Sequence, residues 1–114
     1  MLLKDYPVVL PDYILTLEEL SPENCLFFDI ETTGLSWKTS HLYLLGAVFY
    51  ENETWIHRQW FCQKPGEEKE VLLAFSELLS TKKLLFHYNG TTFDVPYLMH
   101  KYTFYQLPAP WEGT

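Results

Sequence analysis

The sequence predicts an α/β domain with a mixed β-sheet, and three observations carry that prediction. An apolar segment has the length of a buried strand, two further strand-like segments, the second of them alternating, follow it as a hairpin, and a helix, a strand and a second helix complete the order. A chain of 114 residues is one domain at most and can bury a core. Because 47% of the residues are hydrophobic and 18% are aromatic, a disordered chain is excluded.

The first core strand is expected over residues 25–31, which are apolar on both faces, as central strands are. Residues 41–50 and 54–63 are expected to pair as a hairpin, because a turn of three polar residues separates them. The sheet should therefore contain at least one antiparallel pair beside the central strand.

A helix is expected over residues 67–79, where apolar side chains recur at helical spacing. Its acidic start, which includes Glu68, suits the positive end of the helix dipole and is expected to face solvent. A short fourth strand should follow at 83–88. A second helix at 93–102 has Pro96 in its first turn, where proline is tolerated.

We expect three segments along the chain: an irregular, proline-containing arm at 1–24, the domain at 25–105, and an irregular tail at 106–114. No apolar run approaches the ~20 residues of a membrane-spanning helix and no signal peptide is visible, so a cytoplasmic location without a membrane partner is expected. Cys25 and Cys62 fit no zinc spacing and are expected to be structural thiols of a reducing compartment.

The motif that indicates chemistry is a pair of carboxylates, Asp29 and Glu31, at the end of the first strand. Their side chains share one face, because the side-chain period of a strand is two. They repel each other unless a cation lies between them, and hard divalent cations take oxygen ligands. Asp94 follows the fourth strand, so it joins the pair if the first and fourth strands are parallel neighbours.

The net charge sets a limit on this interpretation. At −7, it argues against a module that holds nucleic acid by bulk electrostatics. It argues less against an enzyme whose acidic centre is offset by bound metal.

Two segments resemble motifs of a known family. FDIETTGL at residues 28–35 resembles the first motif of the DEDD 3′→5′ exonucleases, which have a ribonuclease H-like fold. NGTTFDVPYL at residues 89–98 resembles the second, in the form found in family-B polymerase exonuclease domains and bacterial YprB-type exonucleases. Each motif falls at an expected strand end, and the resemblance covers about residues 25–102.

The resemblance implies a set of roles. Asp29, Glu31 and Asp94 would be catalytic and would ligate two Mg²⁺ or Mn²⁺ ions, which activate a water and stabilise the leaving oxygen of a phosphodiester. The partner would be the single-stranded 3′ end of DNA or RNA, and the sequence leaves that choice open.

Five further residues would contact this substrate. The backbone of Thr32 and Thr33 would cradle the terminal nucleotide, and Leu35 would wedge against its base. Asn89 would orient its loop or contact phosphate, although capping a turn is the plainer alternative. Phe93 would stack near a base or pack in the core.

The third family motif, a Tyr or His general base followed by an Asp, has no match, because no Asp follows Asp94. We therefore expect a fragment that lacks the C-terminal strand and helix of the fold. General-base catalysis is worth roughly 10²–10⁴-fold, so activity of this chain alone should be impaired. A sheet face left bare by the missing helix could also drive self-association.

Two main functions follow from the resemblance. One is a metal-dependent 3′→5′ exonuclease domain, and the other is a catalytically inactive remnant that binds nucleic acid or protein. A phosphoesterase acting on small nucleotides is a more remote third.

Overall fold

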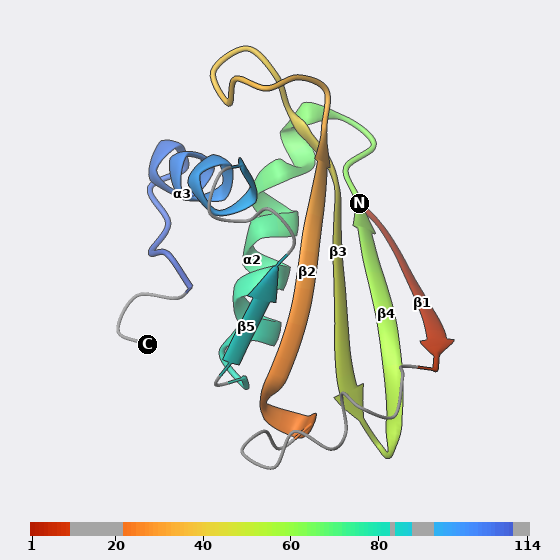
Figure 1. Cartoon of the computed structure of the whole chain (residues 1–114). Coiled ribbons are helices and arrows are strands. Elements are labelled where there is room, and N and C mark those ends of the chain that lie inside the picture. Colours follow the sequence, from red (N-terminus) through yellow and green to blue (C-terminus); the bar gives the residue numbers. More distant parts are fainter. Residues whose placement is uncertain (10–21, 83, 88–92, 111–114) are drawn as a thin grey trace.

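The computed structural model describes residues 1–9, 22–82, 84–87 and 93–110. These described residues form one five-stranded sheet and two α-helices (Figure 1). The strands are β1 (Leu2–Val8), β2 (Cys25–Thr32), β3 (Leu42–Glu51), β4 (Thr54–Phe61) and β5 (Leu84–His87). The helices are α2 (Glu68–Leu79) and α3 (Val95–Phe104), with 3₁₀ turns at Pro22–Asn24 and Pro65–Glu67.

The strand order is β1-β4-β3-β2-β5, and it confirms the predicted mixed sheet. Strand β2 pairs in parallel with β5, whereas the other neighbours are antiparallel. The first and fourth predicted strands are thus parallel neighbours, as the convergence of the three carboxylates required. The element boundaries lie within about two residues of those expected.

The hairpin turn between β3 and β4 is tight. Glu51 pairs with Thr54, so only Asn52 and Glu53 form the loop. Both have positive φ, 53° and 63°, which is the signature of a type I′ turn. The backbone twist of such a turn matches that of the two strands it joins.

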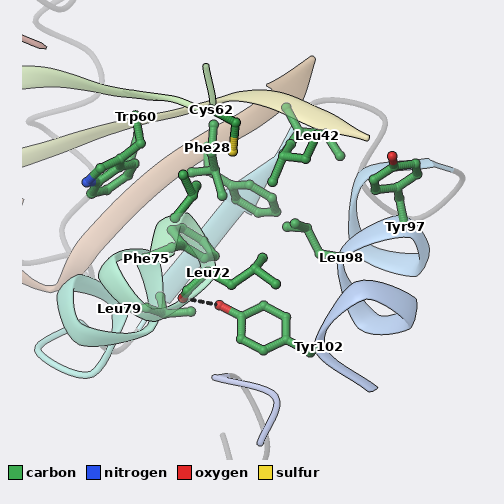
Figure 2. Packing of buried hydrophobic residues seen from close by; sticks show 14 of the residues in the cluster. Phe28, Leu42, Trp60, Cys62, Leu72, Phe75, Leu79, Tyr97, Leu98 and Tyr102 are labelled. Atoms are coloured by element: carbon green, nitrogen blue, oxygen red, sulfur yellow. Dashed lines mark hydrogen bonds between the residues drawn. The ribbon is translucent and has the colours of Figure 1, made fainter. Parts of the chain in front are cut away.

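Both helices pack on one face of the sheet (Figure 1). Alternation along β2 sends Leu26, Phe28 and Ile30 to that face, where all three are buried. The Phe28 ring lies 5.3 Å from that of Phe75 on α2. Figure 2 shows how these side chains meet those of α3 in a continuous apolar core.

A polar contact joins the two helices inside this core. The Tyr102 hydroxyl donates to the Leu72 carbonyl at 2.7 Å and lies 2.8 Å from Ser76 Oγ (Figure 2). Tyr102 is 1% exposed, so its hydroxyl needs these partners.

One expectation about the fold is wrong. The arm at 1–24 was expected to be irregular, but Leu2–Val8 forms an edge strand that pairs with β4 along its whole length. Arg58 of β4 anchors it through a bidentate contact with Asp5, at 2.8 and 2.9 Å. Pro7 hid this strand in the sequence, yet proline is tolerated on an edge, where its missing N–H faces away from the sheet.

Candidate metal-binding site

Asp29 and Glu31 lie on the sheet face opposite the helices. Both residues are exposed, whereas Phe28 and Ile30 on either side of Asp29 are buried beneath the helices. The pleat of β2 therefore holds the two carboxylates side by side, as their spacing predicted.

Although Asp29 is exposed as a residue, its carboxyl group is partly removed from solvent, and this desolvation is the main reason why the pKa of Asp29 lies above its ordinary value; the negative charge of Glu31 raises it further. The nearby His57 on β4 acts in the opposite direction. A carboxylate pair in this state gains from any cation that binds between its members.

Because Gly46 has no side chain, it leaves space for the side chains of Asp29 and His57. It pairs with Asp29 across β2 and β3, and a Cβ there would lie 3.3 Å from Asp29 Oδ1 and 3.2 Å from His57 Nε2. Neither Gly46 nor His57 was predicted from the sequence to be part of the site. A glycine inside an apolar strand was the available signal, since it often marks a close approach.

Asp94, the residue immediately before α3, reaches the same strand end. It is 5% exposed, and its Oδ2 accepts a hydrogen bond from the Ile30 amide at 3.2 Å. Ile30 lies between the two exposed acids and beyond the last β2–β5 pair, Phe28 with His87. The Asp94 carboxylate thus takes up a backbone position of β2 that β5 does not reach.

These contacts bring three carboxylates to one strand end without enclosing an ion. Among residues 1–9, 22–82, 84–87 and 93–110, no group of three or more His, Cys, Asp or Glu side chains could hold a metal ion. Mg²⁺ often binds through one or two carboxylates and keeps several waters. Asp29 and Glu31 fit that donor set, with Asp94 as a neighbour that is already hydrogen-bonded to the backbone.

The loop after β2 is held by hydrogen bonds of its own threonines, and one of its side chains is exposed. The Thr33 amide donates to the His41 carbonyl at 3.0 Å, and Thr33 Oγ1 accepts from the His41 amide at 2.9 Å. Thr32 Oγ1 donates to the Gly34 carbonyl at 2.7 Å. The Thr33 N–H is therefore committed within the protein, whereas Leu35, 87% exposed, is accessible to a ligand.

The residues of the second motif are placed less completely. Phe93 is partly buried against the core, with its ring 5.4 Å from that of Tyr97, so a packing role is the one its contacts show. Asn89 lies outside the described residues.

One acidic residue at the start of α2 is buried, contrary to the prediction from the sequence. Glu68 was expected to face solvent, but it is 3% exposed and pairs at 3.0 Å with Lys101 of α3, which is 5% exposed. No local pattern shows this, because the partner lies on another helix.

The chain is similar in sequence to proteins of a known family. A family model described as the RNase_H superfamily matches residues 26–112. The "Uncharacterized protein YprB" of Bacillus subtilis (strain 168) is 32% identical over 93 residues. That alignment covers 80% of this chain and 22% of the relative, so the chain spans less than a quarter of the protein it matches. The match and the mixed sheet agree with the sequence resemblance: the chain belongs to the RNase H superfamily.

Proposed function

We propose that this chain is a metal-dependent 3′→5′ exonuclease domain that hydrolyses phosphodiester bonds at single-stranded 3′ ends of DNA or RNA. One observation carries the proposal. Asp29 and Glu31 stand side by side on the sheet face opposite the helices, where both are exposed, and Asp94 is hydrogen-bonded to the amide between them. Membership of a superfamily of nucleases supports the choice of substrate class.

The residues of the site would share the work as follows. Asp29 and Glu31 would hold Mg²⁺ or Mn²⁺, which supplies an activated water and charge stabilisation at the leaving oxygen when bound. Asp94 fixes the start of α3 against β2, so that its carboxylate keeps a constant place beside theirs. The exposed Leu35 is suited to pack against the terminal base.

A general base and a fourth carboxylate complete this chemistry in the resembling exonucleases. No segment of the 114 residues matches the motif that supplies them. We therefore propose weak activity for this chain by itself. We also propose a cytoplasmic location, for which two buried cysteines give modest support. Within the part of the chain that the structure describes, no helix is long and apolar enough to span a membrane.

The direct test uses a 5′-labelled single-stranded oligonucleotide with Mn²⁺. Wild-type protein should shorten it from the 3′ end, and Asp29→Asn should lower the rate by at least about 10²-fold, as loss of a group in the reacting centre does. Asp5→Asn, which removes a carboxylate on the distant edge strand, is the matched control and should leave the rate unchanged.

A second function is favoured by the open arrangement of the acids, which form no three-ligand group among the described residues. In this alternative the chain is a catalytically inactive remnant that binds nucleic acid or protein. Oligonucleotide binding without cleavage, equal in wild-type and Asp29→Asn protein, would favour it over the exonuclease.

A further inference from the structure

The ion pair between Glu68 and Lys101 is the most deeply buried charged contact among the described residues. Its atoms lie 3.0 Å apart, and both residues are nearly inaccessible to solvent. Burying two charges is costly, and well-packed apolar residues of similar volume are often as stable or more so. Stability alone is thus a weak reason for this pair.

The hydrogen bonds of the pair connect separate parts of the chain. Glu68 Oε2 accepts from the Leu42 amide at 2.8 Å, and Glu68 Oε1 accepts from the Tyr105 hydroxyl at 2.6 Å. Lys101 Nζ donates to the Ser40 carbonyl at 3.0 Å. Two of these three partners, Ser40 and Leu42, lie where the loop between β2 and β3 ends and β3 begins.

This loop is the one that presents Leu35. It leaves β2 after Thr32 and returns at Leu42, and its base is closed by the two hydrogen bonds between Thr33 and His41. It lies at the end of the sheet where α2 begins (Figure 1). Ser40 Oγ lies 2.9 Å from the Tyr97 hydroxyl, so α3 contacts the returning end a second time.

Helix α3 connects the carboxylate of Asp94 with the lysine that holds the β2–β3 loop. Asp94 stands at its start and bonds to β2, and Lys101 lies about two turns further along. A helix is stiff over that length, so the bond from Lys101 to Ser40 ties the loop to the element that holds Asp94. Glu68 contacts both Lys101 and the Leu42 amide, so it links α3 to the start of β3.

We propose that Glu68 and Lys101 are positioning residues that set the β2–β3 loop, and with it Leu35, relative to the carboxylate of Asp94. The consequence for substrate rests on the proposed exonuclease function, whereas the effect on the loop does not. The pair touches none of the expected metal ligands and acts through Ser40 and Leu42.

Amide hydrogen exchange measures the loop directly. In Lys101→Met, the amides of Thr33 and His41 should exchange at least about tenfold faster, because the variant removes the charged donor that holds the Ser40 carbonyl. Tyr102→Phe is the matched control. It removes a buried bond between the same two helices without touching the loop, and its loop exchange should match the wild type.

Kinetics supply the second readout. Where the wild type degrades a 3′ end with Mn²⁺, Lys101→Met should raise KM for the oligonucleotide about tenfold with a smaller change in kcat, and Tyr102→Phe should not. Mn²⁺ affinity should stay within twofold of wild type in both variants. Lys101→Arg, which keeps the charge and a donor, should recover part of the loss.

Two results would overturn the proposal: equal loop exchange in Lys101→Met and Tyr102→Phe, or a loss confined to Mn²⁺ affinity. If Lys101→Met does not fold, the neutral double variant Glu68→Gln/Lys101→Met removes both buried charges together and serves the same exchange measurement. A wild type without 3′→5′ activity would count against the proposed function alone, since the exchange result is independent of it.

Discussion

Gly46 matters at the residue scale because of the side chain it lacks. We expect Gly46→Ala to push Asp29 or His57 aside, since the new methyl group would meet both at 3.2–3.3 Å. Mn²⁺ affinity measured by calorimetry should fall about tenfold, or about 1.4 kcal/mol. The change in melting temperature should be small, because the displaced atoms are the ends of side chains.

Gly66→Ala is the control for that substitution, because nothing lies within 4 Å of a Cβ at this position. It should leave both metal affinity and stability near wild type. Equal affinities in the two variants would show that Asp29 tolerates a neighbour at Gly46.

The buried Cys62 thiol predicts how stability depends on alkaline pH. Burial, with a smaller contribution from Glu68 and Glu67, raises its pKa from 9.0 to about 12. Above pH 9 the unfolded chain loses this proton and the folded protein keeps it, so the free energy of unfolding falls as pH rises. The slope for one group is at most about 1.4 kcal/mol per pH unit.

Denaturant titrations at pH 7, 9 and 10 would measure this loss. Cys62→Ala should have a shallower slope between pH 9 and 10, with the remainder due in part to Cys25, whose pKa burial also raises. A slope that the substitution leaves unchanged would assign the loss to other groups.

At the scale of elements, β1 is the part of the sheet that the sequence hid. Its removal should expose the backbone of β4 as a new edge, and such edges recruit other chains. We expect a chain without residues 1–8 to melt at a lower temperature and to elute as larger species in size-exclusion chromatography.

Asp5→Asn distinguishes the contribution of the Asp5–Arg58 ion pair to stability from that of the backbone hydrogen bonds between β1 and β4. It weakens the contact with Arg58 and leaves the pairing with β4 in place, so the cost should be at most about 1 kcal/mol. A shortened chain as stable and monomeric as wild type would mean that β1 adds little to the sheet.

The elements that the sequence predicts correctly are those with a local pattern. The apolar strand β2, the hairpin of β3 and β4 and the periodic helix α2 each show a pattern within their own short stretch of the chain. Strand β1 does not, because Pro7 is acceptable only where the strand has a free edge, and that depends on the whole sheet.

In the candidate site, too, the features with a local pattern are predictable and those that depend on distant residues are not. The shared face of Asp29 and Glu31 follows from the pleat of a single strand and is predictable. The bond from Ile30 to Asp94 joins residues 64 positions apart, and the role of Gly46 depends on cross-strand register. The burial of Glu68 likewise requires Lys101 on another helix.

At the scale of the whole molecule, a bound ion should stabilise the fold. The carboxylates of Asp29 and Glu31 repel each other in the folded protein. A ligand that binds only the folded state adds about 2.7 kcal/mol to the free energy of unfolding when its concentration is 100 times its Kd. We expect Mn²⁺ to raise the melting temperature of the wild type. Asp29→Asn should abolish the shift, and a shift that persists in this variant would place the ion elsewhere.

The type I′ turn at Asn52–Glu53 has a consequence for the order in which the chain folds. It lets β3 and β4 pair after closing a loop of two residues, whereas β1–β4, β2–β5 and the Ile30–Asp94 bond must each close a long one. Short loops cost the least chain entropy and form fastest. The hairpin should therefore form early, and the three carboxylates should come together last. In a refolding experiment, the rate at which metal binding recovers should then equal the rate of the final folding step and be slower than the initial collapse.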